Sequence, residues 1–167
     1  MKVSGITPRF VAPYAIAAMP ARYVFERGAW SEAAALRPLG SNYPFVEAIT
    51  HFARSVGAAR SGDLAAARQD AEKLQALQSA LAAANNGYWA SEVEVQRLAA
   101  TAWIALGDGK ADEALRLMNA AADLEDRNEK HIVTPGRIVP ARELLGEMLL
   151  ELKQPATALR EFEASQQ

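Results

Sequence analysis

The sequence contains no cysteine, no long apolar run and no alternating strand pattern. Without cysteine the chain forms no disulfide, no zinc-thiolate site and no thiol nucleophile, although this absence alone does not decide the compartment. No apolar run approaches the roughly 20 residues that a membrane span requires. Val, Ile and Thr do not alternate with polar residues over any stretch, so the sequence predicts no strand. We therefore expect neither a membrane protein nor a β-sheet protein.

The charges of the sequence are not concentrated in a way that indicates a polyanionic partner. The 167 residues carry 18 Lys and Arg against 20 Asp and Glu, a formal net charge of -2. Residues 1–84 hold nine basic and six acidic side chains, whereas residues 85–167 hold nine and fourteen. A nucleic-acid-binding surface needs basic side chains clustered on one face. We therefore predict no nucleic-acid partner.

The sequence is rich in alanine and in apolar residues at helical spacing. Half of the residues are apolar, and alanine has the lowest cost of any residue in a helix. Apolar residues recur at steps of three and four in most segments between helix breakers, which predicts helices. In the N-terminal segment we predict one short helix from Phe10 to Met19 and a second that begins at Pro20, because proline suits the first turn of a helix.

The apolar start of the chain also bears on its location. Pro13 interrupts this apolar stretch and Pro20 follows it, which favours a structural helix over a cleaved signal peptide. We predict a cytoplasmic protein, with a periplasmic or exported location as the alternative. At this length we expect one domain over residues 1–167.

A turn residue followed five positions later by an alanine recurs four times. The pairs are Gly28 and Ala33, Gly62 and Ala67, Gly109 and Ala114, and Lys153 and Ala158. The first interval between these alanines is 34 residues, and the next two are 47 and 44. The pattern is fullest in the last hairpin, which has Leu145-Gly146, then Pro155, Ala158 and Phe162.

These features resemble the tetratricopeptide repeat (TPR), a helical hairpin of about 34 residues with a Leu-Gly pair, an alanine and an aromatic residue at set places. The chain looks similar to bacterial repeat proteins of this type. The resemblance implies an all-α fold, a right-handed superhelical array of antiparallel hairpins. About four hairpins are expected, the first irregular, at residues 10–36, 43–84, 88–126 and 139–167. The sequence departs from the family at Arg54-Ser55, where the Leu-Gly pair belongs, and at Lys153, which replaces the usual turn glycine.

A helical-repeat array offers a curved inner surface lined by the first helix of each hairpin. An aromatic floor with arginine at one end and glutamate at the other suits an extended or helical peptide. We predict a non-catalytic adaptor or scaffold that binds a protein or peptide there. The alternative is that Phe52 and Trp103 belong to the core, because repeat helices bury residues on two sides. The candidate partner-binding residues are Ile49, Phe52, Val56, Arg60, Gln96, Trp103, Glu143 and Glu147.

Few residues have side chains suited to catalysis or metal binding. For His51, which lies one helical turn after Glu47, a packed or groove-edge role is favoured over a catalytic one. His131 falls in the loop at 127–137, and neither histidine has metal-ligand spacing around it. We predict no enzyme, no metal site and no cofactor. The carboxylates at 143, 147 and 151 repeat every four residues, as either an acidic strip for a cationic partner or a solvated helix face.

The second functional hypothesis is a structural module that associates with itself, or a fragment of a longer repeat protein. Each repeat buries its apolar surface only against its neighbours, so the end of an array needs a covering element. We expect Leu159 and Phe162 to pack inward, and Leu144, Met148 and Ala156 to remain uncovered. This predicts a homodimer through the C-terminal hairpin. Gly146 and Ala158 are expected to be the small residues at which the last two helices approach each other.

Overall fold

The computed structural model describes residues 9–128 and 136–166. Helices account for most of these residues, and no strand occurs among them, so the predicted all-α class is confirmed. The helices are α1 (Val11–Glu26), α2 (Trp30–Ala34), α3 (Pro44–Arg60), α4 (Leu64–Ala83), α5 (Gly87–Gly107), α6 (Ala111–Arg127), α7 (Ala141–Glu151) and α8 (Pro155–Ala164).

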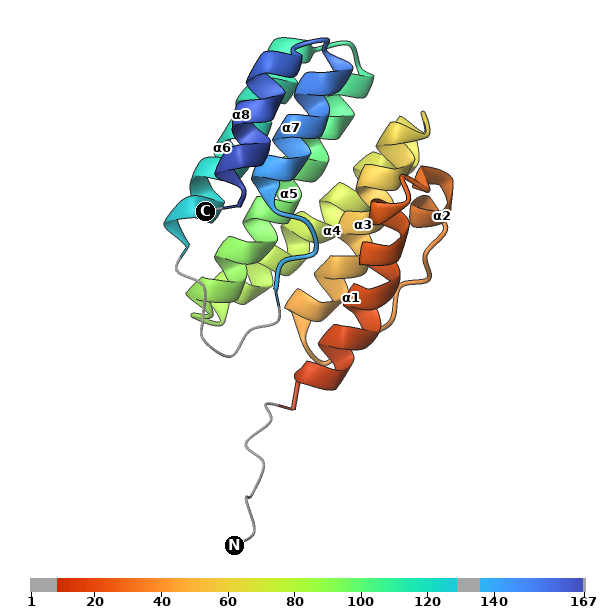
Figure 1. The fold of residues 1–167 in the computed structure, drawn as a ribbon. Coiled ribbons are helices and arrows are strands. Elements are labelled where there is room, and N and C mark those ends of the chain that lie inside the picture. Colours follow the sequence, from red (N-terminus) through yellow and green to blue (C-terminus); the bar gives the residue numbers. More distant parts are fainter. Residues whose placement is uncertain (1–8, 129–135, 167) are drawn as a thin grey trace, which may run out of the picture.

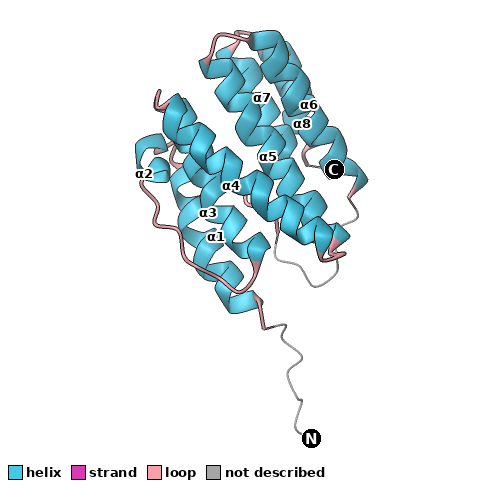
Figure 2. Cartoon of the chain, turned by 180° about the vertical axis from the view of Figure 1, so that it is seen from behind, coloured by secondary structure: helices cyan, strands magenta, loops and turns pink. Residues whose placement is uncertain are grey.

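The helices are arranged as four consecutive pairs (Figure 1). The members of each pair contact each other, and α2, α4 and α6 each pack against the first helix of the next pair. The first helices also meet in order, α1 with α3, α3 with α5, and α5 with α7. Figure 2 shows, from behind, that α4 lies across the junction between α3 and α5. The core therefore runs through the whole stack and is centred on α3 and α5.

The turns inside the four pairs share one backbone feature. Each has a residue in the left-handed region, where a side chain is strained and glycine is favoured. These residues are Gly28, Gly62, Gly109 and Lys153, with φ values of 60°, 92°, 78° and 60°. The alanines that follow five positions later are all fully buried. The recurring pair of turn and alanine therefore marks where each second helix starts and which of its positions faces inward.

The predicted break between Met19 and Pro20 is wrong, because α1 runs through Pro20. A proline inside a helix removes one backbone hydrogen bond, here to the carbonyl group of Ile16. Pro20 and Ile16 both lie on the exposed side of α1, where water can replace the lost bond. The opposite face packs into the core on both sides of Pro20, through Tyr14, Ala17, Ala18, Ala21, Val24 and Phe25. This burial holds the helix together across the proline.

The last hairpin is packed differently from the prediction. Gly146 lies against the ring of Phe162, since a Cβ atom there would be 2.5 Å from the ring, and Ala158 is not among its nearest neighbours. Leu144 and Met148 are buried, at 1% and 0% exposure, because α7 is covered by α5, α6 and α8 together. Leu159, which was expected to pack inward, is 57% exposed, whereas Ala156 is exposed as expected.

Candidate functional site

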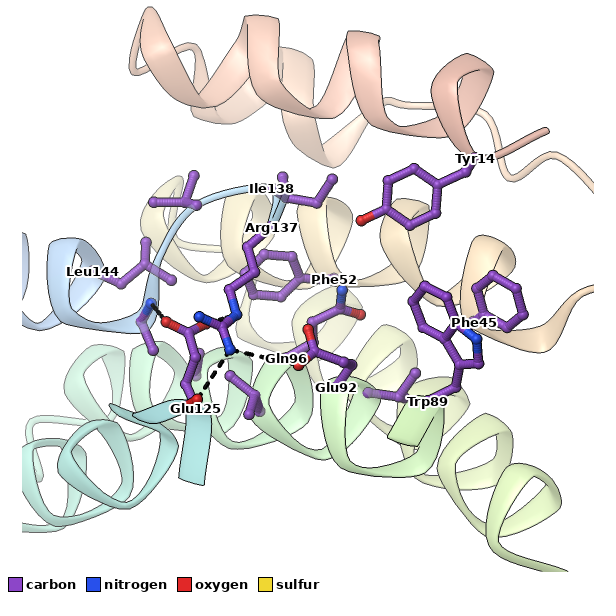
Figure 3. Close-up of a pocket in the computed structure, with 15 residues that line it drawn as sticks. Tyr14, Phe45, Phe52, Trp89, Glu92, Gln96, Glu125, Arg137, Ile138 and Leu144 are labelled. Atoms are coloured by element: carbon purple, nitrogen blue, oxygen red, sulfur yellow. Dashed lines mark hydrogen bonds and ion pairs between the residues drawn. The ribbon is translucent and has the colours of Figure 1, made fainter. Parts of the chain in front are cut away.

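A short non-helical segment, residues 136–140, crosses the molecule between α1 and the pair formed by α5 and α6. We call it the crossing segment, and Figure 3 shows its surroundings. Arg22 of α1 donates hydrogen bonds to the carbonyl oxygens of Gly136 and Arg137, the latter at 2.8 Å. The hydroxyl of Tyr14 also lies 3.4 Å from the Gly136 oxygen. Helix α1 thus holds the backbone of the crossing segment.

The side chain of Arg137 points the other way, toward α5 and α6 (Figure 3). Its Nε lies 3.3 Å from a carboxylate oxygen of Glu125, and its Nη2 donates to the backbone oxygen of Glu125 at 2.9 Å. The same Nη2 is 3.7 Å from the carboxylate of Glu92, which also accepts a hydrogen bond from Asn128. One guanidinium therefore links two carboxylates from different helices.

Glu125 of α6 is a buried carboxylate that lies against the start of α7. It is 5% exposed, and its Oε1 accepts a hydrogen bond of 2.9 Å from the backbone N–H of Ala141. Burial raises the pKa of Glu125 to about 7, against the opposing effects of Arg137 and of the Ala141 N–H. Burial likewise raises the pKa of Tyr14 to about 12. Both groups are therefore protonated or partly protonated near neutral pH.

Aromatic rings form the opposite wall of the site. Phe45 of α3 and Trp89 of α5 are stacked, with ring centroids 3.8 Å apart. Phe10 meets both rings edge-on, at 5.4 and 5.8 Å, and Tyr14 lies 6.1 Å from Trp89. This cluster ties the start of α1 to α3 and α5, and it gives the site a rigid apolar side next to its charged one.

Between these walls lies a cavity of about 30 Å³, which is room for one or two water molecules. Phe52, Val93, Ala99, Ile138 and Leu144 add apolar surface to its lining. Gln96 also lines it, and the Oε1 atom of Gln96 is buried but accepts no hydrogen bond from the described residues. A buried acceptor without a donor is costly, so this atom marks a place where a further N–H group would be stabilised.

The structure places four of the predicted partner-binding residues in the core, which corrects their assignment to an accessible surface. None of the four is more than 2% exposed, because α3 and α5 are covered by neighbouring helices on several sides. They are Ile49, Phe52, Val56 and Trp103. Of these, Phe52 does line the cavity, together with the predicted Gln96. The alternative expectation, that Phe52 and Trp103 are core residues, is confirmed.

Arg60 and Glu147 were expected at opposite ends of the surface, but they form an ion pair with each other. Arg60 also reaches Glu151 at 2.5 Å. Its guanidinium lies between two rings, 3.8 Å from the centroid of Trp30 and 4.0 Å from that of Trp103. The acidic series on α7 therefore finds its cation within this chain, and the cluster joins the first three helix pairs to the last.

Glu143, the remaining predicted residue of that series, has no ion-pair partner among the described residues. Burial, and next the charge of Glu147 one turn further along α7, raise the pKa of Glu143. Glu143 is partly exposed and lies outside the cavity lining. Phe52 and Gln96 line the cavity, and Glu143 does not.

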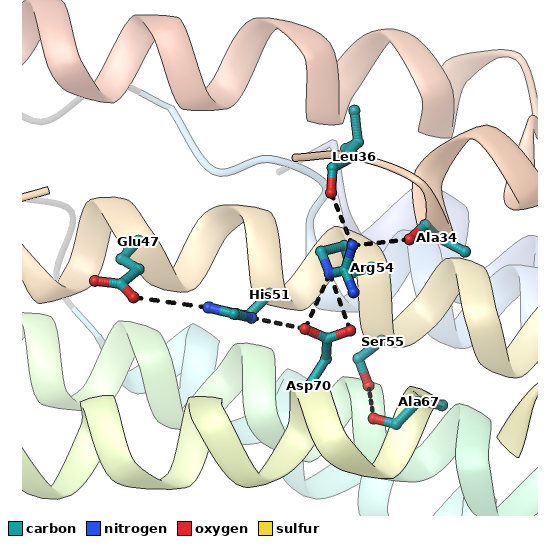
Figure 4. A network of polar contacts seen from close by, with 8 residues as sticks. All are labelled: Ala34, Leu36, Glu47, His51, Arg54, Ser55, Ala67 and Asp70. Atoms are coloured by element: carbon teal, nitrogen blue, oxygen red, sulfur yellow. Dashed lines mark hydrogen bonds and ion pairs between the residues drawn. The ribbon is translucent and has the colours of Figure 1, made fainter. Parts of the chain in front are cut away.

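His51 has the packed role that was favoured over a catalytic one (Figure 4). Its ring is buried, with Nδ1 at 2.7 Å from Asp70 and Nε2 at 3.7 Å from Glu47. Arg54 donates to the same Asp70 at 3.0 Å and to the backbone oxygens of Ala34, the last residue of α2, and of Leu36. Burial alone would raise the pKa of Asp70, but the hydrogen bonds from His51 and Arg54 lower it. This network fastens α2, α3 and α4 together, whereas His131 lies outside the described residues.

Several residues of the site escaped the sequence analysis. Trp89 and Glu92 precede Gln96 at helical steps of three and four, so the face that predicted Gln96 also carried them. Glu125 falls inside the predicted hairpin at 88–126 and Arg137 at the end of the predicted loop at 127–137, and neither belongs to a recognisable motif. No local pattern could have found these two, because their meeting depends on the path of the crossing segment.

Comparisons with protein-family models, with curated proteins and with solved structures found no match. Among the described residues no group of three His, Asp or Glu side chains is placed to hold a metal ion. In the same part of the chain no helix has the length and apolar character needed to cross a bilayer.

Proposed function

We propose that the protein is a non-catalytic adaptor or scaffold of TPR-like architecture that binds a peptide segment of another protein. The observation that carries this proposal is the crossing segment. It is held across the stack by hydrogen bonds to its backbone from α1 and by ion pairs to its one charged side chain from α5 and α6. A surface that binds an irregular segment through its backbone and one anchor side chain has the properties of a peptide site.

Support for the TPR-like part comes from the order of the helix contacts and from the four turns with their buried alanines. Support for a non-catalytic role comes from His51, whose two ring nitrogens both face carboxylates of the same structural network. The partner-contacting residues in this proposal are those around the cavity, namely Tyr14, Trp89, Glu92, Gln96 and Glu125. A cytoplasmic location stays a prediction.

The proposal is tested by selecting random nonapeptides on the wild-type protein and measuring their affinities by calorimetry. Glu92→Ala should weaken the selected peptides by roughly tenfold or more, since a truncated anchor contact typically costs above 1 kcal/mol. Arg116→Ala, on the exposed side of α6, is the matched control and should change nothing. If the selected peptides bound the wild type, Glu92→Ala and Arg116→Ala equally well, the binding surface would lie elsewhere.

Self-association is the second candidate function, and exposed apolar residues favour it. Ile16, Met19 and Tyr23 form a stripe on α1 with exposures of 55%, 63% and 58%. At the other end of the stack Leu150 and Leu159 are 50% and 57% exposed. Exposed apolar patches of this kind are typical of protein interfaces. These residues replace Leu144 and Met148 as the candidates for a homodimer surface.

Light scattering over a range of concentrations tests this second candidate. An associating protein should show a mass that rises with concentration, and Met19→Glu or Leu159→Glu should abolish the rise. Leu39→Glu, at a 45% exposed loop position, is the control and should associate like the wild type. A wild-type mass that stays monomeric at high concentration would remove this candidate.

A further inference from the structure

We propose that the crossing segment is an internal ligand that competes with the partner, and that the partner peptide carries an arginine followed by an aliphatic residue. This inference rests on the proposed function and names the chemistry of the ligand. Its basis is the match between the segment and its surroundings, where Arg137 meets two carboxylates and Ile138 is 7% exposed among the apolar lining residues.

The charged half of the site selects a guanidinium. Glu92 and Glu125 come from α5 and α6, and the guanidinium of Arg137 lies between them, as Figure 3 shows. A guanidinium presents five N–H donors in a planar fork, whereas an ammonium is a compact point charge. Arg137 uses this fork by donating to the Glu125 backbone oxygen while it faces the carboxylates. An acidic peptide side chain would meet the like charge of Glu92 here.

The internal fit is incomplete, which leaves room for a better ligand. Arg137 is 3.7 Å from Glu92, longer than a hydrogen bond, and Gln96 Oε1 beside it receives no donor from the described residues. A peptide that is not joined to α6 and α7 can shift its guanidinium toward Glu92 and Gln96. Such a ligand would satisfy an acceptor that the crossing segment leaves unpaired.

Few side chains of the crossing segment are buried. Of its five residues only Ile138 is buried, while Gly136, Arg137, Val139 and Pro140 are partly exposed. Release therefore uncovers one aliphatic side chain, breaks the Arg137 contacts and breaks the hydrogen bonds from Arg22 and Tyr14 to the backbone of the segment. The segment is nevertheless tethered at both ends, which gives it an effective concentration on the order of millimolar at the site. A partner must outcompete this tethered ligand.

The decisive experiment uses an emptied variant, Arg137→Ala with Ile138→Ser, and fluorescein-labelled peptides with blocked ends. The probe is TPGRIVP, the sequence of residues 134–140. We expect it to bind the emptied variant at least about tenfold more tightly than the wild type, because the internal competitor has lost its anchors. TPGEIVP should bind the emptied variant at least about tenfold more weakly than TPGRIVP, with TPGKIVP in between.

A third mutation, Glu92→Gln, serves as the specificity control and should reduce the preference for TPGRIVP over TPGEIVP. Equal binding of TPGRIVP by wild type and emptied variant would overturn the competition. Equal binding of the arginine and glutamate peptides would overturn the ligand chemistry. An emptied variant without a cooperative helical melting transition would overturn the inference too, because an internal ligand is dispensable for folding. If selected nonapeptides bind through Glu92 but carry no arginine, this inference fails while the proposed function stands.

Discussion

Gly146 of α7 faces the ring of Phe162 of α8 at a distance that leaves no space for a side chain, since a Cβ atom would lie 2.5 Å from the ring. Any larger residue must displace either the ring or the helix. We expect Gly146→Leu to lower the free energy of unfolding by about 1 to 3 kcal/mol through overpacking. Urea denaturation followed by circular dichroism measures this.

The same pair provides its own control. Phe162→Ala removes the ring that blocks the space, so Gly146→Leu should cost less in that background than in the wild type. Gly40→Ala, at a position with nothing within 4 Å of the added Cβ atom, should be nearly neutral. Additive costs in the double mutant would show that Gly146 is required for another reason.

Arg60 should stabilise the stack through its two tryptophan contacts and its two carboxylates. Its side chain is only 11% exposed, so solvent screens these interactions weakly. We expect Arg60→Ala to cost about 2 kcal/mol and Arg60→Lys about 1 kcal/mol, because lysine keeps the charge but loses the planar stacking. Arg68→Ala, which removes a more exposed ion pair with Asp108, should leave the melting temperature nearly unchanged. Similar losses for Arg60→Ala and Arg68→Ala would contradict this ranking.

Glu125 should make stability fall as the pH rises through the neutral range. Its pKa is about 7 in the fold and 4.5 ordinarily, so between these values the folded protein binds the proton more tightly than the unfolded chain. The Glu125 contribution is therefore complete below pH 4.5 and is lost as the pH rises through about 7, a change of about 3 kcal/mol. Arg137 and the Ala141 N–H lessen the shift, while Glu92 and Asp126 add to it.

Unfolding by urea at a series of pH values between 4.5 and 8 measures this dependence. Glu125→Gln should flatten the profile, because glutamine does not titrate. Glu143→Gln is the matched control, since the pKa of Glu143 is also raised but that residue is less buried, and it should flatten the profile less. Asp70 acts in a separate window, because its lowered pKa affects stability only in more acidic solution. If the free energy of unfolding of the wild type did not fall between pH 4.5 and 8, the raised pKa of Glu125 would be refuted.

Lys153 occupies a left-handed turn position, with φ of 60°, that the other three pairs fill with glycine. At such a position a residue with a Cβ atom is less stable than glycine by about 1 to 2 kcal/mol, because its backbone is strained. Substitution by glycine removes this strain, but the greater freedom of glycine in the unfolded chain cancels part of the gain. We expect Lys153→Gly to stabilise the protein by about 0.5 to 1 kcal/mol, seen as a higher melting temperature. Lys73→Gly, on the exposed face of α4, should instead destabilise by about 1 kcal/mol. Destabilisation by both changes would mean that the Lys153 side chain has contacts that outweigh the strain.

The sequence by itself determined the features that depend on neighbouring residues along the chain. Periodic apolar positions and helix breakers located the second, third and fourth helix pairs, and the turn residues located the buried alanines, because a helix and its ends are set within a few residues. The sequence could not decide that α1 continues through Pro20, since the burial that compensates for the proline comes from distant helices.

Only the tertiary structure decided which residues a partner could reach. Ile49, Val56 and Trp103 have the spacing expected for the inner face of a repeat array. Periodicity does not say how many sides of a helix are covered, and here neighbouring helices bury all three side chains. Likewise the path of a loop is not encoded in local propensity, so nothing near Arg137 in the sequence predicted its place between Glu92 and Glu125. That meeting depends on α5, α6 and α7 being packed together, a long-range outcome of burial in the whole stack.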